Sequence, residues 1–269
     1  MSTEDPEDIL SGSLEILYDY KPVTLTSAGS VFSYTSGNIP GNPITLRTPD
    51  THPSNWSLHA SSIWASSLFL ADHLQFLDLP SSPAESFRVL ELGAGAGLPG
   101  ISIARKHPSI QATLSDYPDE ELIRTLEGNI ARNDVQDNCC AVAYSWGSES
   151  SALTGGFDVI VAADTLWNPD LHALFIKALQ SMLKRSPDAR VHLVAGLHTG
   201  RYTIRSFIAA AESAGFDVVQ ATEMEAGGSD RRAWCVSRAE EEDEKERRRW
   251  VVWIVLEWVS QTKAYKAYT

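Results

Sequence analysis

Three glycines separated by single alanines follow a short apolar stretch, Val89 to Leu92. Glycine lacks a Cβ atom and adopts backbone conformations that other residues avoid, so Gly93, Gly95 and Gly97 would let the chain turn sharply and approach a ligand closely. A helix that begins after this turn would present free N–H groups and a partial positive charge. The spacing predicts a loop that binds a nucleotide-like ligand, and an ordinary turn between a strand and a helix is the alternative.

Two carboxylates lie where such a ligand would need them. Asp116 comes about twenty residues after the glycine turn, at the end of the second predicted strand, where an acidic residue accepts hydrogen bonds from ribose hydroxyls. This spacing suits either NAD or S-adenosylmethionine. A helix cap is the alternative role, but Asp119 is available for that. Glu91 lies two residues before Gly93 and is expected to orient the turn or to meet a cationic ligand through water.

A third carboxylate, Asp164, ends the strongly apolar stretch that runs from Phe157 to Ala163. The carboxyl ends of parallel strands form the crevice in which open α/β sheets bind ligands, so Asp164 is expected in that crevice. Capping of the following helix is its alternative role. The glycines follow the order Gly-x-Gly-x-Gly, without the third glycine of the dinucleotide motif at its helix-packing position, which favours S-adenosylmethionine over NAD.

The elements that must position these residues alternate regularly from residue 87 onward. Strands are predicted over residues 87–92, 112–115, 139–145, 157–163, 190–196, 216–221 and 251–259, and helices over residues 97–106, 119–132, 169–183 and 202–214. Such alternation indicates an α/β fold with a parallel sheet and helices on both faces. The last two strands are joined without a core helix, which predicts an antiparallel hairpin at the edge of the sheet. The charged block 240–249 between them is expected to be a solvated loop or short helix.

The first part of the chain is less regular. Residues 1–57 are rich in Pro, Gly, Ser and Thr, and are expected to form an N-terminal arm that packs on the core, with a short helix opening near Glu7 and a short strand between Leu25 and Tyr34. Residues 57–77 show the apolar spacing of an amphipathic helix that carries Trp64.

Composition limits the classes of function. The 269 residues include 22 Lys and Arg against 35 Asp and Glu, a net charge of −13, which disfavours non-specific nucleic-acid binding and leaves a basic protein partner or a small ligand. Three cysteines, of which Cys139 and Cys140 are adjacent, suit neither a disulfide framework nor a zinc site. The acidic start, Met1 to Asp8, is no signal peptide, and no apolar run reaches the roughly 18 residues of a membrane helix. These features predict a cytoplasmic protein.

Four sequence blocks together resemble the seven-strand S-adenosylmethionine-dependent methyltransferases, and among them the lysine methyltransferase group called family 16. The blocks are the glycine motif Glu91 to Gly100, the series Asp116, Leu126, Asn129 and Asn133, the triplet Ser145-Trp146-Gly147, and Asp164-Thr165-Leu166-Trp167, in which Trp replaces the usual Tyr. The resemblance implies a Rossmann-like seven-stranded sheet with a C-terminal antiparallel edge hairpin, within a methyltransferase domain of residues 58–269.

The resemblance also implies a role for each site residue. The cofactor-binding set would be Trp64, Glu91, Gly93, Ala94, Gly95, Asp116, Tyr117, Trp146 and Ala163, and the catalytic set Asp164 and Trp167, with no metal. The glycine loop would hold the methionine part of S-adenosylmethionine, with Trp64 closing over it. Asp116 would bind the ribose, beside an adenine that Tyr117 flanks and Trp146 contacts. Asp164 would face the methyl-transfer site, and Trp167 would border a substrate channel whose aromatic wall suits an ammonium group.

A narrower resemblance concerns the methyl acceptor. Residues 57–70, the pair Trp167-Asn168 with His172, and residues 247–252 are similar to fungal members of the family that methylate the N-terminal and lysine amines of elongation factor 1-alpha. Those members have long been labelled nicotinamide N-methyltransferases by analogy. The expected partner is therefore a protein substrate, with elongation factor 1-alpha as the first candidate, and the expected state is a monomer.

The implied reaction is an in-line transfer of a methyl group from a sulfonium to a neutral amine, which requires mainly proximity and alignment. The amine must first lose its proton, which is easier for an α-amine, with a pKa of about 8, than for a lysine, with a pKa of about 10.4. Asp164 could steer the amine through a hydrogen bond.

Three other functions stay open. An NAD-dependent oxidoreductase would need a His or a Tyr-Lys pair, and although His192, His198 and Tyr202 lie around the fifth core strand, no Lys stands near them. The others are a small-molecule N-methyltransferase that acts on nicotinamide or a similar amine, and a module that binds the cofactor without turnover.

Overall fold

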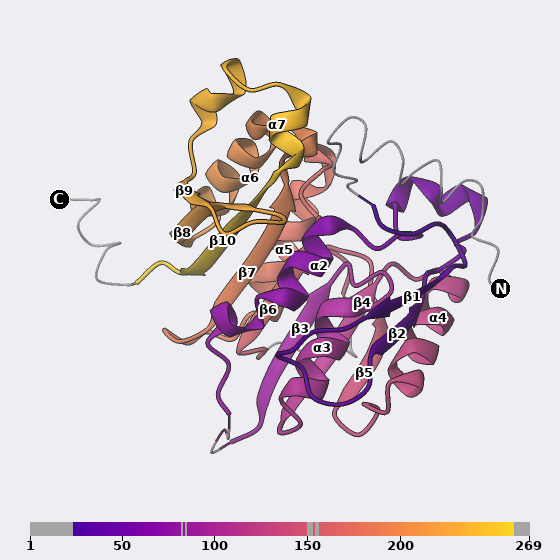
Figure 1. Ribbon diagram of the computed structural model, residues 1–269. Coiled ribbons are helices and arrows are strands. Elements are labelled where there is room, and N and C mark those ends of the chain that lie inside the picture. Colours follow the sequence, from indigo (N-terminus) through magenta and orange to yellow (C-terminus); the bar gives the residue numbers. More distant parts are fainter. Residues whose placement is uncertain (1–23, 82, 84, 150–152, 154–155, 261–269) are drawn as a thin grey trace, which may run out of the picture.

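The computed structural model describes residues 24–260, apart from 82, 84, 150–152 and 154–155. A central sheet lies between two layers of helices, and a separate two-stranded hairpin lies beside one of these layers (Figure 1). The expected α/β class with helices on both faces of the sheet is confirmed. The short helix expected near Glu7 falls outside the described residues.

The elements follow the predicted alternation closely. The strands are β1 (Val31–Tyr34), β2 (Ile44–Arg47), β3 (Phe87–Leu92), β4 (Ile110–Asp116), β5 (Cys139–Ala143), β6 (Val159–Ala163), β7 (Arg190–Gly196), β8 (Phe216–Glu225), β9 (Arg231–Ala233) and β10 (Trp250–Trp258). The α-helices are α2 (Ala65–Asp72), α3 (Leu98–Lys106), α4 (Glu120–Arg132), α5 (His172–Met182), α6 (Arg201–Ser213) and α7 (Glu244–Arg248). Short 3-10 helices are η1 (Pro53–Leu58), η2 (Leu74–Leu77), η3 (Pro169–Leu171), η4 (Leu197–Thr199) and η5 (Val236–Glu240).

The eight strands of the main sheet run in the order β5-β4-β3-β6-β7-β10-β8-β9. The five strands from β5 to β7 are mutually parallel, so their carboxyl ends share one edge of the sheet. The last long strand, β10, runs antiparallel to both β7 and β8 and lies between them. The expected antiparallel hairpin is therefore present, but β10 is internal. The short strand β9, which the sequence did not predict, forms the edge and raises the number of strands from seven to eight.

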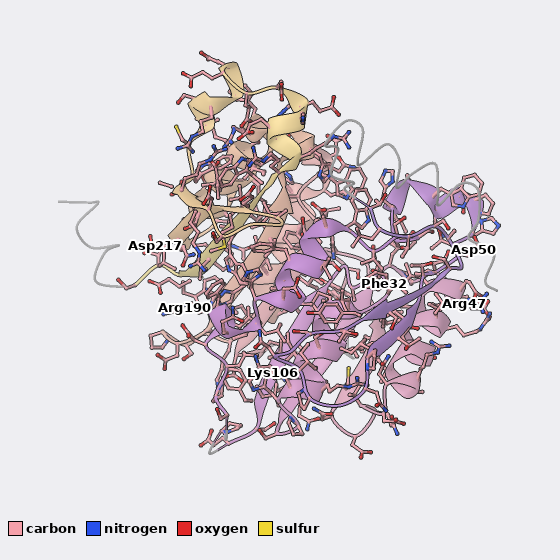
Figure 2. The ribbon with its side chains drawn as sticks, viewed as in Figure 1. Phe32, Arg47, Asp50, Lys106, Arg190 and Asp217 are labelled. Atoms are coloured by element: carbon pink, nitrogen blue, oxygen red, sulfur yellow. The ribbon has the colours of Figure 1, made fainter. Side chains whose placement is uncertain are left out.

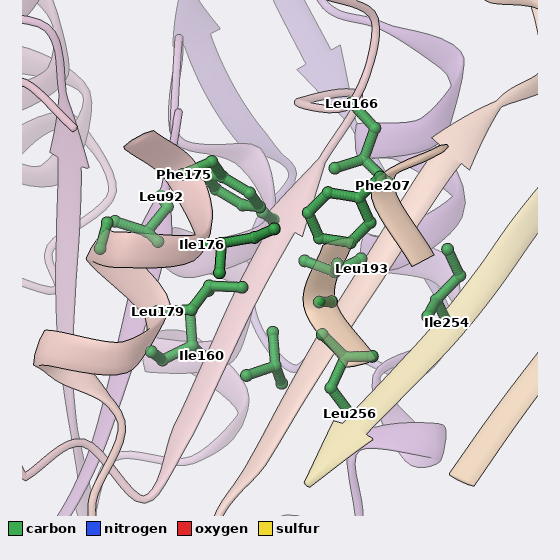
Figure 3. Close-up of a cluster of buried hydrophobic side chains, with 14 of the residues drawn as sticks. Leu92, Ile160, Leu166, Phe175, Ile176, Leu179, Leu193, Phe207, Ile254 and Leu256 are labelled. Atoms are coloured by element: carbon green, nitrogen blue, oxygen red, sulfur yellow. The ribbon is translucent and has the colours of Figure 1, made fainter. Parts of the chain in front are cut away.

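One face of the sheet packs against α5 and α6. The alternation of side chains along β3 sends Leu90 and Leu92 to this face. Figure 3 shows how strand residues meet helix residues in this layer: Leu92, Ile160, Leu193, Ile254 and Leu256 from the strands, and Phe175, Ile176, Leu179 and Phe207 from the helices. These side chains are almost fully buried, so this layer forms a rigid base for the loops above it.

The opposite face packs against α2, α3 and α4, and the β1–β2 hairpin extends this layer. The buried amide of Asn129 on α4 donates to the carbonyl oxygen of Arg47 and accepts from the N–H of the same residue, at 2.8 Å each. Asn133, one helical turn later, makes the same pair of bonds with Thr45. The two asparagines therefore hold strand β2 as a neighbouring strand would, and fix the hairpin to the core.

The helix that the sequence predicts over residues 57–77 is shorter in the structure. The α-helix begins at Ala65 and ends at Asp72, and residues 59–64, between η1 and α2, are not helical. Backbone bonds to the N-terminal arm explain this, because the N–H of Leu25 donates to the carbonyl oxygen of Ile63 at 2.8 Å and the N–H of Ile63 donates to Thr26 Oγ1 at 2.7 Å. Trp64 has an extended backbone conformation at the helix N-cap, so its side chain is not on the helix body.

The charged block 240–249 forms the short helix α7 and its flanks, as expected, but one end of it is not solvated. Glu242 binds the guanidinium of Arg201, whose side chain is fully buried at the first residue of α6. The same guanidinium binds Glu223 of β8, which has no exposed side-chain surface. This ion-pair network connects the segment between β8 and β10 to the residue that follows η4 and Gly200.

Charged side chains otherwise lie mostly on the outside of the molecule. Figure 2 shows Arg47, Asp50, Lys106, Arg190 and Asp217 at its periphery. Among the described residues, no helix is both long and apolar enough to cross a membrane. Over the same residues, His, Cys, Asp and Glu side chains form no group of three or more that could hold a metal ion.

Candidate functional site

A cavity of about 330 Å³ opens at the carboxyl ends of β3, β4, β6 and β7. All eleven residues that the sequence predicts for the site line it: Trp64, Glu91, Gly93, Ala94, Gly95, Asp116, Tyr117, Trp146, Ala163, Asp164 and Trp167. Residues that lie up to 103 positions apart in sequence are thus brought to one place by the parallel strands. The volume is in the range of small-molecule and cofactor sites.

The glycine loop is held against β4 by its backbone. The N–H groups of Gly93 and Ala94 donate to the carbonyl oxygen of Ser115 at 2.9 and 3.1 Å. Gly93 has a φ of +70°, and a Cβ atom there would stand 2.9 Å from Thr165 Cγ2 and 3.5 Å from the ring of Trp146. Both the backbone conformation and the space therefore require glycine, and a larger residue would enter the cavity.

Asp116 connects the end of β4 to this loop. Its Oδ2 accepts a hydrogen bond from the N–H of Gly95 at 2.6 Å, and its Oδ1 accepts one from the N–H of Tyr117 at 2.7 Å. Burial raises the pKa of Asp116 to about 6, against the lowering effect of these two N–H donors. A carboxylate has about four lone-pair directions, so further acceptor capacity remains for a ligand. Asp116 does not cap α4, because Asp119 accepts from the N–H groups of Glu121 and Leu122.

Glu91 lies beneath the loop with an exposed fraction of 2%. Its Oε2 accepts a hydrogen bond from the N–H of Gly100, in the first turn of α3, at 2.9 Å. This contact orients the start of the helix, which is the first of the two roles expected for Glu91. Burial raises the pKa of Glu91 to about 8, with a smaller contribution from the nearby charge of Asp116.

Aromatic rings form much of the remaining wall. Trp146 packs on Phe175 of α5, with ring centroids 4.7 Å apart, so its ring is fixed beside the glycine loop. Tyr117 is 39% exposed at the rim next to Asp116. At the other end, Trp64 donates from Nε1 to the carbonyl oxygen of His59 at 2.8 Å. Trp167 meets the same histidine ring edge-on, with centroids 5.0 Å apart.

Asp164 ends β6 in a left-handed backbone conformation, with a φ of +55°. Residues other than glycine rarely adopt this conformation, and when they do they are found disproportionately at functional sites. Its Oδ1 accepts a hydrogen bond from the N–H of Gly196 on β7 at 2.9 Å. The alternative role as a helix cap is not observed, since the side chain of Asn168 caps η3. Burial raises the pKa of Asp164, and the charge of nearby His198 opposes that rise.

The lining includes residues that the sequence analysis did not single out as site residues, among them His59, Tyr144, Thr165 and His198. His198 follows the end of β7, so the rule that carboxyl ends of parallel strands carry ligand-binding residues could have identified it. No such signal exists for His59, because its segment had the apolar spacing of a helix. Its left-handed φ of +54° is visible only in the structure.

Three acidic side chains and two histidines, His59 and His198, line the cavity, and Glu91, with a pKa of about 8, is largely protonated at neutral pH. Glu91, Asp116 and Asp164 line it, and no Lys or Arg occurs among the described residues of its lining. A cationic ligand such as a sulfonium or an ammonium fits this set. The pyrophosphate of a dinucleotide would instead bring two negative charges next to buried carboxylates, with no cation to balance them.

A search for related proteins agrees with this geometry. The model of the lysine methyltransferase family matches residues 53–213. The protein N-terminal and lysine N-methyltransferase of Schizosaccharomyces pombe is 30% identical over 193 residues, which cover 67% of this chain and 72% of that protein. The relative of the same description from Gibberella zeae is 28% identical over 190 residues, which cover 64% of this chain and 67% of that protein.

Solved structures match the fold. The mitomycin 7-O-methyltransferase superposes with a TM-score of 0.52 at 16% identity, covering 77% of this chain and 58% of the other. The fibrillarin pre-rRNA processing protein of Methanococcus jannaschii superposes with a TM-score of 0.50 at 13% identity, covering 89% and 98%. The fold is thus the Rossmann-like fold found in S-adenosylmethionine-dependent methyltransferases. The chain belongs to the lysine methyltransferase family, whose members use S-adenosylmethionine.

Proposed function

We propose that this protein transfers the methyl group of S-adenosylmethionine to an amine of a protein substrate, either an N-terminal α-amine or a lysine side chain. The observation that carries the proposal is the cavity lined by Glu91, Asp116 and Asp164, with no lysine or arginine among the described lining residues. This acidic lining suits a cationic cofactor at one end of the cavity and an amine that arrives as a cation at the other end. Family membership and the names of the fungal relatives support the same reaction class.

The residues present fit the cofactor along the length of the cavity. Gly93 and Gly95 leave the space that an amino-acid chain needs, since added Cβ atoms would stand 2.9 Å from Thr165 Cγ2 and 3.6 Å from the carbonyl oxygen of Ala60. Asp116 would accept hydrogen bonds from ribose hydroxyls, and the rings of Tyr117 and Trp146 would contact the adenine. Trp64 and Ala163 would enclose the sulfonium end. Bound there, S-adenosylmethionine supplies an activated methyl group.

The chain then has to align an amine with that methyl group and keep water away from it. Asp164 would accept a hydrogen bond from the amine, because its Oδ1 is already fixed by Gly196 and its carboxylate retains acceptor capacity. Trp167 would border the path of the incoming side chain, where a ring face attracts an ammonium group. The edge-on contact with His59 fixes the orientation of the Trp167 ring.

Elongation factor 1-alpha is the first candidate substrate. This candidate rests on the narrower sequence resemblance at Trp64, Trp167 and residues 247–252. A protein with net charge −13 would also attract a basic partner. A small-molecule amine such as nicotinamide is the second candidate, because the aromatic wall would accept it equally well. We propose a monomeric, cytoplasmic enzyme that acts without a metal ion, a membrane or nucleic acid.

Methyl-tritiated S-adenosylmethionine distinguishes these candidates. The protein is incubated with bacterially expressed elongation factor 1-alpha, with nicotinamide, and with a lysate of the source cells, and protein and small-molecule fractions are counted separately. The proposal predicts label in the elongation factor, or in one other discrete protein band of the lysate. Label confined to small molecules would support the nicotinamide-like reaction, and no label in any fraction would reduce the protein to a module that binds the cofactor without turnover.

A further inference from the structure

His198 lies beside the residue that we expect to meet the amine. It belongs to η4, the short turn that follows β7, while Asp164 ends the neighbouring parallel strand β6. The two side chains therefore emerge at the same edge of the sheet, and both line the cavity. The imidazole stacks on the indole of Trp64, with ring centroids 5.6 Å apart and an angle of 18° between the planes.

The surroundings of Gly196 show that the side chains of His198 and Asp164 come close to each other. A Cβ atom on Gly196 would stand 2.5 Å from His198 Nδ1 and 3.3 Å from Asp164 Oδ1. The imidazole and the carboxylate thus face the same small space, which only a residue without a side chain leaves open. Within the part of the chain that the structure describes, the ring nitrogens of His198 make no hydrogen bond, so they remain available to a ligand.

Buried ion pairs and a residue of α7 lie against the turn that carries His198. Arg201, the first residue of α6, places its fully buried guanidinium between Glu223 and Glu242. From α7, Arg247 reaches the same turn, with its Nη1 3.9 Å from the Cβ position of Gly200. Among the described residues, Asp164 on β6 therefore faces His198, Arg247 on α7 lies at the end of the same turn, and His59 meets the other contact of His198, Trp64.

We propose that His198 is the proton acceptor for the substrate amine, with Asp164 as the hydrogen-bond partner that orients that amine. This inference rests on the proposed function. A proton of the substrate's ammonium group moves to a ring nitrogen of His198, and the freed lone pair of the neutral amine forms the new N–C bond, which leaves the positive charge on the methylated nitrogen. The S–C bond breaks with its electron pair left on sulfur, which removes the sulfonium charge. The imidazolium then returns its proton to solvent.

Other groups in the cavity suit this task less well. Asp116 accepts a hydrogen bond from the N–H of Gly95 in the glycine loop, and Glu91 accepts one from the N–H of Gly100 in α3. Asp164 is held by Gly196 and can accept a hydrogen bond. His59 makes edge-on contacts with the rings of Trp64 and Trp167. Stacking on Trp64 gives His198 in contrast a fixed ring orientation next to the carboxylate.

The test compares His198→Gln with Gly196→Ala. The first removes the base, and the second keeps both side chains while its methyl group displaces the imidazole from Asp164. Gly196 has a φ of −69°, so alanine there adds no backbone strain. Matched controls are His107→Gln, at the far end of α3, and Gly128→Ala, where a Cβ atom meets nothing within 4 Å.

The measured quantities are the initial rate of tritium transfer to the protein that the wild type labels, its pH dependence, and the Kd of S-adenosylmethionine by calorimetry. We expect His198→Gln to lower the rate by about 100-fold or more and to lose one ascending limb of the pH profile. Gly196→Ala should also lower the rate, while both keep the cofactor Kd within about threefold. Added imidazole should restore part of the rate in His198→Ala, which a purely structural histidine would not allow.

Wild-type rates and an unchanged pH profile in His198→Gln would overturn this inference and leave the proposed function intact. Loss of the ascending limb in His59→Gln instead would assign the proton to His59 and overturn it as well. If the wild type labels no protein at all, the proposed function fails, and this inference fails with it.

Discussion

Three carboxyl groups line the same cavity, but their environments suit them to different tasks. Asp116 is bonded to the glycine loop through Gly95, Glu91 holds the start of α3 through Gly100, and Asp164 faces His198 across Gly196. Only Asp164 has the strained backbone and the contact with a second titratable side chain that suit a reacting centre. The residues next to the glycine loop would therefore control cofactor affinity, and Asp164 would control turnover.

Cofactor affinity can be tested at the glycine loop itself. Asp116→Ala removes the acceptor for ribose hydroxyls and releases the Gly95 N–H, and Gly93→Arg fills the cavity. We expect each change to weaken the calorimetric Kd of S-adenosylmethionine by at least about 100-fold, since buried polar groups of the site and ligand lose their partners. Glu127→Ala, which removes an exposed carboxylate from α4, is the control. Unchanged affinity in both variants would contradict the cofactor assignment.

The raised pKa of Glu91 predicts that the free energy of unfolding depends on pH. Burial raises its pKa from the ordinary 4.5 to about 8, so the folded protein binds this proton more tightly than the unfolded chain does. The stabilisation is complete below the unfolded pKa and is lost as the pH rises toward 8. Without ligand, the free energy of unfolding should fall by roughly 2–4 kcal/mol between pH 5 and pH 8 from this group.

Glu91→Gln keeps an acceptor for the Gly100 N–H and removes the titration. Its chemical-denaturation stability should therefore change much less between pH 5 and pH 8 than that of the wild type. Glu127→Gln should behave as the wild type does. An equal pH dependence in Glu91→Gln would show that Glu91 is not the titrating group.

Much of this residue-level account could be predicted from the sequence. Glycine spacing, the acidic residues that end strands and the family resemblance together predicted eleven residues that the structure brings to one cavity. No role could be assigned to His59, because its position depends on its own left-handed turn. The place of His198 after β7 could have marked it as a candidate, but its stacking on Trp64 could not be predicted. Neither feature leaves a local pattern in the sequence.

At the level of elements, the two asparagines of α4 hold the N-terminal hairpin and the glycine loop together. Asn129 binds both backbone groups of Arg47 and also donates to the carbonyl oxygen of Ala96 at 2.9 Å. The sequence analysis placed Asn129 and Asn133 in a family motif without a physical role. The structure supplies that role, since they replace a missing neighbouring strand for β2.

Asn129→Ala should therefore destabilise the protein by roughly 3 kcal/mol, because buried backbone groups of Arg47 and Ala96 lose their partners. It should also weaken cofactor binding, since Ala96 lies in the glycine loop. Urea denaturation and calorimetry measure the two effects. Asn42→Ala, at an exposed position of the hairpin, should change neither. Wild-type stability in Asn129→Ala would show that the hairpin does not depend on this contact.

The boundaries of elements followed the sequence where a mostly apolar run forms a buried strand, as for β3, whose bounds agree with the prediction. The predicted boundaries were wrong where a long-range backbone contact decides the conformation. Residues 57–64 have helical spacing, but Ile63 pairs with Leu25 and Thr26 of the arm. The place of β10 inside the sheet was likewise not predicted, because strand order depends on pairing between distant segments.

For the whole molecule, the acidic cavity predicts which ligand stabilises the fold. S-adenosylmethionine at about 100 times its Kd should add about 2.7 kcal/mol to the free energy of unfolding and raise Tm by roughly 5–10 °C. NAD at the same concentration should cause no shift, because its pyrophosphate meets carboxylates and no cation. A shift with NAD and none with S-adenosylmethionine would favour the oxidoreductase reading. Differential scanning fluorimetry is sufficient for this comparison.

Intact-mass and peptide mass spectrometry of a methyl acceptor tests the central claim most directly. Bacterially expressed elongation factor 1-alpha is incubated with S-adenosylmethionine and either the wild-type protein or Asp164→Ala. The account predicts mass increments of about 14 Da per methyl group at the N-terminal α-amine or at a lysine with the wild type. It predicts at least about a 100-fold slower gain with Asp164→Ala, at unchanged cofactor affinity. Equal methylation by Asp164→Ala and the wild type would contradict it.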